Sequence, residues 1–214
     1  MRIYKYIYAT IATLAALSAS YAQTGSNAIK ILDNSAAAIK KCGNIKATFT
    51  AAQFKNKQKQ TSENGTVYVS GKKYYYDLKN AQIWYDGKTQ WTYSATTQEV
   101  NISSPTKAEA AKMNPYSFIY LYKQGYNASV TEDVVRGKKC YDVHLVNKAS
   151  KSIKYIYLTI DKETMLLLCI RVSANNSDWT RISIFDISKK QKFGSDKFLF
   201  NPKEFPNAEI IDLR

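Results

Sequence analysis

The sequence predicts a mainly β protein with a smaller helical part. The chain has 17 Tyr and 8 Phe but only 8 Gly and 4 Pro, and aromatic residues favour strands. From residue 45 onward, apolar and polar residues alternate through most of the chain, which is typical of half-buried strands. Short turns join these segments, so we expect a meander of about eleven antiparallel strands. A meander of this length must curl into a barrel or split into two sheets.

The first 22 residues have the features of a secretory signal peptide. Two basic residues precede an apolar run from Ile7 to Leu17, and Ser20-Tyr21-Ala22 provides a small-residue cleavage site. We expect cleavage after Ala22, export of the remainder, and a single domain over residues 23–214. A lipid-anchored protein would carry a cysteine directly after the cleavage point, but the first cysteine is Cys42. We therefore expect that the mature chain is not itself lipidated.

The mature chain begins with a helix and then changes to strands. Apolar residues at spacings of three and four predict an amphipathic helix from Asn27 to Lys41. After Gly43 the period becomes two, and Asp86-Gly87-Lys88 indicates a hairpin turn because Gly accepts a positive φ. A turn-like segment from Lys55 to Asn64 interrupts the alternation. The expected strands are Ile45 to Ala51, Thr66 to Ser70, Lys73 to Leu78, Ala81 to Tyr85, Trp91 to Tyr93 and Glu99 to Ser103.

Helical character returns in the middle of the chain. Ser104-Pro105 is a helix start signal, and a second short helix follows Asn114-Pro115. This second segment, Tyr116 to Tyr122, has almost no polar face, so it must be buried on several sides or contact apolar material. Alternation then resumes in five further strands: Ala128 to Val135, Lys139 to Val146, Ile153 to Ile160, Leu166 to Val172 and Trp179 to Ser188.

The composition argues against an enzyme, a metal site and a nucleic-acid partner. The formal net charge is +14, which favours encounters with anionic surfaces without specifying one, and the export signal makes nucleic acid a minor partner class. With one His and three Cys, a usual zinc site would need nearly all of these residues, at spacings that the chain does not show, so we expect no metal and no cofactor. His144 could hydrogen-bond to Asp142 on one strand face, a pair typical of a solvated face rather than a catalytic dyad. No nucleophile elbow, H-E-x-x-H motif or phosphate-binding glycine loop is present.

The three cysteines allow at most one disulfide in an oxidising compartment. The best candidate pair is Cys140 with Cys169. Buried free thiols are common core residues, so the redox state stays open at this point.

Several segments together resemble the LolA family of periplasmic outer-membrane lipoprotein carriers. They are Ile45 to Thr50, Gly65 to Val69, Trp84 to Tyr93 with its DGKT turn, Asn114-Pro115 with the apolar helix behind it, and Phe200 to Asp212. The match extends over nearly all of the mature chain. The resemblance implies an incomplete antiparallel β-barrel, whose concave face is covered by an α-helical lid over an apolar cavity for acyl chains.

The resemblance also implies a function and a set of partners. It predicts a periplasmic monomer that binds the acyl chains of lipoproteins and delivers them from the inner toward the outer membrane. Acylated lipoproteins would be the cargo and an inner-membrane lipoprotein-releasing ABC transporter the donor, while the existence of an outer-membrane receptor stays open. The alternatives are a lipid sensor and a carrier of a different amphiphile such as a glycolipid, which the many tyrosine hydroxyls would suit.

Strand alternation nominates the wall of the cavity, because alternate residues share one face of a strand. The predicted wall residues are Phe49, Tyr74, Tyr76, Leu78, Trp91, Tyr93, Val100, Ile102, Val143, Leu145, Ile156, Leu158, Ile160, Ile170 and Val172. The predicted lid residues are Ile29, Leu32, Ile39, Phe118, Ile119 and Leu121. The alternative interpretation is that both sets are ordinary core residues of a filled barrel.

The sequence departs from the family at the lid latch. Family members commonly have an Arg just before the aromatic third strand, a residue tied to lid opening, whereas the window Ser70-Gly71-Lys72-Lys73 has none. Lys72 or Lys73 could supply the charge but not the planar guanidinium that bonds several carbonyls at once.

Overall fold

The computed structural model describes residues 25–106, 109–110, 113–150 and 152–214. The predicted signal peptide, residues 1–22, lies outside the described residues. None of the described helices is both long enough and apolar enough to cross a membrane.

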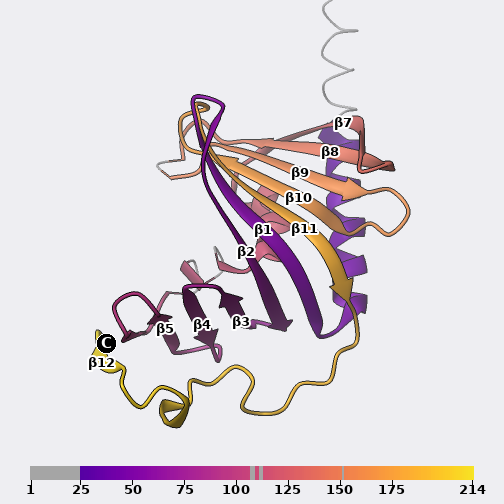
Figure 1. Ribbon diagram of the computed structural model, residues 1–214. Helices are drawn as coiled ribbons and strands as arrows, with labels where there is room; N and C mark the ends of the chain where they lie inside the picture. Colours follow the sequence, from indigo (N-terminus) through magenta and orange to yellow (C-terminus); the bar gives the residue numbers. More distant parts are fainter. Residues whose placement is uncertain (1–24, 107–108, 111–112, 151) are drawn as a thin grey trace, which may run out of the picture.

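The dominant element is one large sheet, with strands linked by short turns (Figure 1). Its strands are β1 (Ile45–Lys55), β2 (Gln58–Ser70), β3 (Lys73–Leu78), β4 (Ala81–Tyr85), β5 (Gln90–Ser94), β6 (Glu99–Ser103), β7 (Asn127–Val135), β8 (Lys138–Val146), β9 (Tyr155–Asp161), β10 (Leu167–Ser173), β11 (Asp178–Ser188) and β12 (Glu209–Asp212).

The sheet is an open, incomplete barrel, as predicted. The strand order is β12-β6-β5-β4-β3-β2-β1-β11-β10-β9-β8-β7, so β7 and β12 are free edges. Two meanders, β1 to β6 and β7 to β11, are joined by pairing of β1 with β11. All neighbours are antiparallel except β12, which runs parallel to β6.

Two strand predictions are wrong. The segment from Lys55 to Asn64 is not turn-like as a whole, because β1 and β2 continue their pairing through it as a protruding hairpin. Only Asn56 and Lys57 form the turn, both with positive φ (49° and 67°), as a tight hairpin requires. The segment is polar because both of its faces meet solvent, which hides the strand period. The short strand β12 was missed, since its residues are mostly exposed and show no alternation.

The helices cover one face of the sheet, which we call the inner face (Figure 1). Residues 25–42 are helical, close to the prediction, and residues 109–110 and 113 are also helical. The apolar segment that follows is the 3-10 helix η1 (Pro115–Gln124). The Asn114 side chain caps it by accepting a hydrogen bond from the Tyr116 backbone N–H, and Gly125 ends it with φ 82°.

Apolar residues pack on both faces of the sheet. On the inner face, helix residues such as Ala28, Leu32 and Ile119 join strand residues from β1 to β4 and β8 to β11 in one large cluster. A smaller cluster lies on the opposite, outer face, where Tyr75 and Trp84 meet Phe198 of the C-terminal segment. That segment includes η2 (Pro202–Glu204) and runs back across the outer face to β12.

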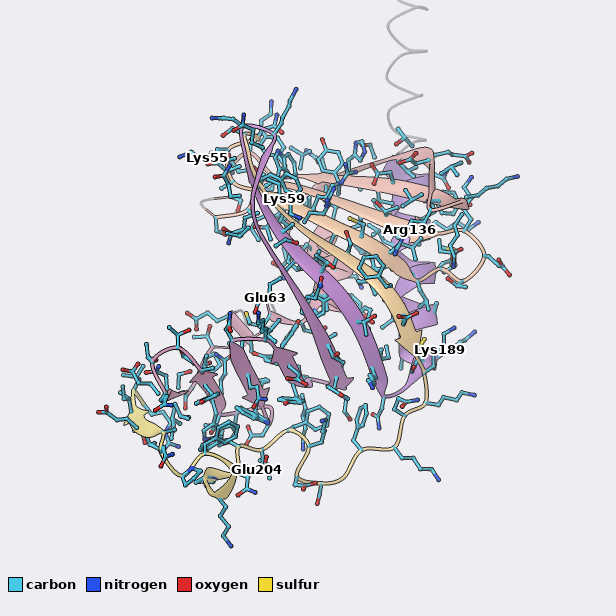
Figure 2. All side chains as sticks on the ribbon, viewed as in Figure 1. Lys55, Lys59, Glu63, Arg136, Lys189 and Glu204 are labelled. Atoms are coloured by element: carbon cyan, nitrogen blue, oxygen red, sulfur yellow. The ribbon has the colours of Figure 1, made fainter. Side chains whose placement is uncertain are left out.

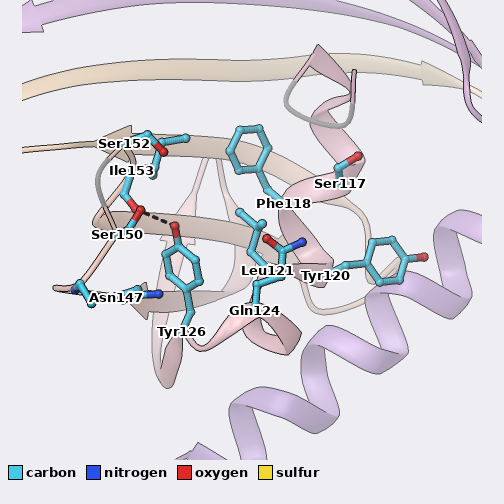
Figure 3. Close-up of a pocket in the computed structure, with 11 residues that line it drawn as sticks. Ser117, Phe118, Tyr120, Leu121, Gln124, Tyr126, Asn147, Ser150, Ser152 and Ile153 are labelled. Carbon is cyan, nitrogen blue, oxygen red and sulfur yellow. Dashed lines mark hydrogen bonds between the residues drawn. The ribbon is translucent and has the colours of Figure 1, made fainter. Parts of the chain in front are cut away.

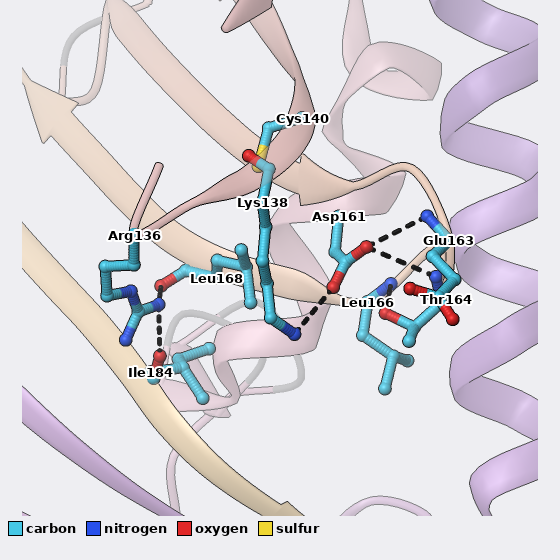
Figure 4. Close-up of polar contacts among 9 residues, drawn as sticks. All are labelled: Arg136, Lys138, Cys140, Asp161, Glu163, Thr164, Leu166, Leu168 and Ile184. Carbon is cyan, nitrogen blue, oxygen red and sulfur yellow. Dashed lines mark hydrogen bonds and ion pairs between the residues drawn. The ribbon is translucent and has the colours of Figure 1, made fainter. Parts of the chain in front are cut away.

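Arg136 connects the β7–β8 turn to strands β10 and β11 (Figure 4). It lies in the β7–β8 turn and donates hydrogen bonds through Nη2 to the carbonyl oxygens of Leu168 (3.3 Å) and Ile184 (2.7 Å). Both carbonyls lie beside register irregularities, in β10 and β11 respectively. Bulges leave backbone groups without ladder partners, so this guanidinium satisfies carbonyls of two strands. Lys138 pairs with Asp161 at 2.9 Å in the same region.

Candidate functional site

The inner face brings together most of the predicted wall residues. Phe49, Tyr74, Tyr76 and Leu78 come from β1 and β3, and the remainder come from β8, β9 and β10. All of them belong to the inner cluster or pack against it: Phe49, Tyr74, Tyr76, Leu78, Val143, Leu145, Ile156, Leu158, Ile160, Ile170 and Val172. The sheet therefore presents a continuous apolar surface to the helices.

The predicted inward orientation of Trp91, Tyr93, Val100 and Ile102 is wrong. Directly opposed residues of antiparallel strands share a face, and Tyr75 pairs with Trp84, Trp84 with Trp91, and Trp91 with Ile102. Tyr93 pairs with Val100 in the same way. All four lie on the outer face with Tyr75, where Trp91 and Tyr93 pack against the outer cluster.

Polar residues take the inner side of β5 instead. Tyr85 pairs with Gln90 across the hairpin, and Gln90 Oε1 accepts a hydrogen bond from the hydroxyl of Tyr74 at 2.8 Å. Alternation fixes which residues of one strand share a face, but turn length fixes which face that is. The prediction placed the aromatic residues of β5 on the inner face, which is the wrong face. The same error extends to β6, because opposed residues of β5 and β6 share a face.

The predicted lid residues divide in the same way. Leu32, Phe118 and Ile119 are buried in the inner cluster, and Ile39 and Leu121 pack against it. The prediction that Ile29 faces the sheet as a lid residue is wrong, because Ile29 is 40% exposed. The buried stripe of the first helix is Ala28, Ile31, Leu32 and Ser35, so Ile29 lies at its edge.

Among the residues that the structure describes, side-chain hydrogen bonds connect the helices to their surroundings at three places. The Tyr76 hydroxyl donates to the Met113 carbonyl oxygen, and Ser35 Oγ donates to the Met165 carbonyl oxygen at 2.7 Å. The Tyr122 hydroxyl of η1 donates to Asp33 Oδ1 of the first helix at 2.5 Å. The helical cover is thus held by apolar packing with a few hydroxyl contacts.

Lys72 and Lys73, the predicted latch, do not make such contacts. Both are exposed at the β2–β3 turn, and Lys73 pairs with Ser70 beside the inward-facing Tyr74. Within the described part of the chain, neither lysine has a hydrogen bond or ion pair to a helix. The hydroxyl of Tyr76 provides the contact between sheet and cover instead, a residue that we predicted only as wall.

A cavity of about 450 Å³ lies between η1 and one end of the sheet (Figure 3). Its apolar lining includes Phe118, Leu121, Tyr126 and Ile153. Its size falls in the roughly 300–1,000 Å³ range of small-molecule sites. The Tyr126 hydroxyl donates to the Ile153 carbonyl oxygen at 2.6 Å, and the β8–β9 connection also brings the polar residues Asn147, Ser150 and Ser152 to the lining. Of the lining, only Phe118 and Leu121 were predicted.

Burial keeps the inner tyrosines neutral. It raises the pKa of Tyr76 and of Tyr74 well above the ordinary value of 10, and neighbouring tyrosines add to the rise. Both hydroxyls therefore stay protonated at neutral pH and act as hydrogen-bond donors inside the protein. The pKa of Tyr122 is raised to about 12. The hydrogen bond to Asp33 is the largest cause, and burial is the second.

On the outer face, Asp142 is the centre of a polar network. Its carboxylate accepts hydrogen bonds from Arg171 Nη2 (2.7 Å) and Thr159 Oγ1 (3.1 Å), and His144 Nε2 lies 3.1 Å away. Burial alone would raise its pKa, but the His144 hydrogen bond and the Arg171 charge outweigh burial and hold the pKa of Asp142 below its ordinary value. These contacts join β8, β9 and β10 across the outer face of the sheet.

The described residues offer little to a metal or a redox centre. Within them no group of three His, Cys, Asp or Glu side chains converges. Cys42, Cys140 and Cys169 are free thiols in the structure. Burial raises the pKa of Cys140 and of Cys169, which disfavours the reactive thiolate form.

Comparisons with known proteins agree with this architecture. A family model described as outer membrane lipoprotein carrier protein LolA matches residues 17–174. The sequence has no match among curated proteins. An uncharacterized conserved protein from Thermus thermophilus has a similar structure, with TM-score 0.57 and 11% identity over 86% of this chain and 97% of that chain.

Two further solved structures are more distantly similar. A DUF1329 family protein from Desulfovibrio piger has TM-score 0.46 and 11% identity, covering 83% of this chain and 99% of that chain. A LolA superfamily protein from Nitrosomonas europaea has TM-score 0.45 and 8% identity, covering 81% and 97%. Because the family match spans most of the sequence and the fold agrees with it, the chain belongs to the LolA family of outer membrane lipoprotein carrier proteins.

Proposed function

We propose that this protein is an exported, periplasmic carrier that binds the acyl chains of lipoproteins between its helices and the inner face of its sheet. The main support for the proposal is the apolar inner face, against which the helices pack largely through apolar side chains. An inner-membrane lipoprotein-releasing ABC transporter would load the carrier, and the outer membrane or a receptor on it would accept the cargo. Residues 1–22 would direct export as a cleaved signal peptide.

The physical need for such a carrier follows from the hydrophobic effect. Each methylene group exposed to water costs about 0.8 kcal/mol, so an acyl chain of about sixteen carbons costs on the order of 13 kcal/mol. A carrier that captured all of this free energy would never release the cargo. When the empty protein buries its own inner face against the helices, the cargo gains only the difference between the two arrangements. Moderate affinity then permits transfer.

The inner tyrosines favour an acyl chain over a polar amphiphile. The hydroxyls of Tyr74, Tyr76 and Tyr126 already donate to Gln90 or to backbone carbonyl oxygens. A polar ligand would have to compete for donors that the protein itself uses, whereas an acyl chain needs none. A carrier of a different amphiphile is therefore the second candidate function. Mass spectrometry of lipids extracted from the purified protein distinguishes the two candidates.

The test is release of lipoproteins from spheroplasts into solution by the purified protein. The Leu121→Glu variant places a carboxylate at the cavity, so we expect it to fold but to release much less lipoprotein than the parent. Leu213→Glu is the matched control, because Leu213 is 64% exposed near the C-terminus, and we expect parental release. Release by a folded Leu121→Glu variant at the parental level would contradict the proposal.

A further inference from the structure

A second surface, on the outer face, combines arginines with aromatic rings. We call it the arginine–aromatic patch; it surrounds a hollow of about 390 Å³ lined by Phe54, Lys57, Tyr157, Arg171, Trp179 and Arg181. The residues come from β1, β9, β10, β11 and the β1–β2 turn, so strand pairing fixes their positions. Tyr157 pairs with Arg171 and Arg171 with Arg181, while Phe54 pairs with Trp179. None of these residues takes part in the cavity of the inner face.

The rings hold the guanidinium groups in place. Arg171 lies over the Tyr157 ring and Arg181 over the Phe54 ring, each with Cζ 4.7 Å from the ring centroid. Tyr157 meets Trp179 edge to face at 5.4 Å. Stacking of this kind orders a guanidinium while leaving N–H groups free to bond an anion. Arg171 Nη2 is already bonded to the Asp142 carboxylate at 2.7 Å, so the exposed Arg181 is the arginine of the patch that presents its guanidinium to solvent.

Further positive charge lies directly beside the patch. Lys55, Lys57 and Lys59 are all exposed at the tip of the β1–β2 hairpin, and Figure 2 shows Lys55 and Lys59 near this tip. The Asn56 N–H of this turn donates to the Ser177 carbonyl oxygen at 3.2 Å, which ties the hairpin to the β10–β11 loop. The patch and the hairpin lysines therefore form one basic surface with aromatic rings inside it.

This surface lies at the same end of the sheet as the mouth of the inner cavity. In the strand register of that end, Lys55 of β1 lies opposite Asp178 of β11. Tyr155 of β9 lies opposite Ser173 of β10 and Val146 of β8. Asn147 and Ile153, which line the cavity, belong to the β8–β9 connection at this same end. Figure 1 shows the β1–β2 turn converging there with the loops that follow β8 and β10.

We propose that the arginine–aromatic patch and the lysines of the β1–β2 hairpin form a docking surface for the phosphate-bearing head groups of an anionic bilayer. Arginine pairs bidentately with phosphate, and Trp and Tyr rings suit the membrane interface, where one end is apolar and the other wet. Basic residues gain attraction to anionic lipid within a Debye length. Docking at this end would bring the cavity mouth close to the bilayer. The role of docking in bringing the cavity mouth to the bilayer rests on the proposed function. The docking itself needs no cargo.

The experiment is co-sedimentation of the full mature chain with vesicles made of equal parts phosphatidylglycerol and phosphatidylcholine, compared with phosphatidylcholine alone. We expect binding only to the anionic vesicles, and loss of it at high salt. A Lys57→Gln/Arg181→Gln double variant should bind about 25-fold more weakly, since each charge is worth about fivefold. The matched control is Lys88→Gln/Lys203→Gln, which removes two exposed charges outside the patch, one in the β4–β5 turn and one in η2, and should bind nearly as well as the parent.

Two results would overturn the docking surface. Equal losses in both double variants would show attraction by net charge alone, and a parent that ignores anionic vesicles but binds polyglutamate through Lys57 and Arg181 would show a site for acidic proteins. Uptake of a fluorescent fatty acid without vesicles, measured in the same variants, should stay at the parental level. If the parent takes up no fatty acid yet binds the vesicles, the proposed carrier function fails while the docking surface stands.

Discussion

At the scale of single residues, the charge of Asp142 is the feature with the clearest energetic consequence. Its carboxylate is nearly buried and accepts hydrogen bonds from Arg171 and Thr159, beside His144. Replacing Asp142 by Asn removes the negative charge and puts an NH2 donor where one of the two acceptor oxygens lies, so at least one donor loses its acceptor. The cross-strand network thus ties β8, β9 and β10 together from the outer face, opposite the cavity.

We expect Asp142→Asn to lower the free energy of unfolding by about 1–3 kcal/mol at neutral pH. Because the folded pKa of Asp142 lies below its ordinary value of 3.8, the carboxylate stabilises the fold fully above that pH. The contribution is lost as the pH falls through the folded pKa. Urea unfolding of parent and variant across this range is the measurement, and the difference between them should shrink in acid.

Asp77→Asn serves as the control for this prediction, since Asp77 is exposed on β3. It should lower the free energy of unfolding little, and its difference from the parent should not follow the pH in the same way. A constant difference between parent and Asp142→Asn down to the most acidic pH would show that the charge of Asp142 is not what stabilises the network.

At the scale of elements, the Tyr122–Asp33 hydrogen bond joins η1 to the first helix, and in the proposed carrier it would help to hold the helical cover closed. Tyr122→Phe removes the hydrogen bond to Asp33, worth about 1 kcal/mol. The empty closed state is then weaker, so we expect fatty-acid affinity to rise up to about fivefold and transfer to acceptor vesicles to slow. Fluorescence titration and a vesicle transfer assay measure the two effects.

The same contact should respond to alkaline pH. The folded pKa of Tyr122, about 12, is raised above the ordinary value of 10, so the contact stabilises closure fully below pH 10 and is lost as the pH rises through about 12. The parent should therefore approach the Tyr122→Phe affinity in alkali. Tyr120→Phe, on the same helix but 45% exposed, is the control; if it changes affinity as much as Tyr122→Phe, the Asp33 contact is not the cause.

Elements whose period reflects one buried face were predictable from the sequence. The first helix and most strands follow from their apolar spacing, because each buries one side in the inner cluster. The polar hairpin around Asn56 escaped prediction because both of its faces meet solvent, and β12 because it adds a mostly exposed edge. The face of Trp91 was unpredictable by alternation alone, since aromatic residues pack on both sides of this sheet.

At the scale of the whole molecule, the sheet is covered twice: by helices on the inner face and by the C-terminal segment on the outer face. Phe198 is buried there against Tyr75 and Trp84, with Phe193 edge to face at 5.7 Å. The aromatic residues of this C-terminal segment do not line the cavity beside η1. A movement of the helices on the inner face would then leave the packing of Phe198 against Tyr75 and Trp84 on the outer face unchanged.

This division predicts that Phe198→Ala destabilises the fold without impairing the carrier. Truncating a buried Phe costs about 3–5 kcal/mol, so the midpoint of urea unfolding should fall clearly. Fatty-acid affinity of the folded variant should match the parent, because Phe198 lies outside the inner cluster. Leu199→Ala is the control, since Leu199 is 44% exposed beside it. An altered fatty-acid affinity in folded Phe198→Ala would contradict the separation of the two faces.

Site-specific photo-crosslinking can show whether acyl chains lie between the helices and the inner face, as we propose. A benzoylphenylalanine replaces Leu121 or Val172 on the inner side, or Trp91 on the outer face, and each protein is loaded with a radiolabelled acylated lipoprotein. We expect crosslinks to the acyl chains at Leu121 and Val172 and none at Trp91. Crosslinks at Trp91 with none at the two inner positions would contradict it.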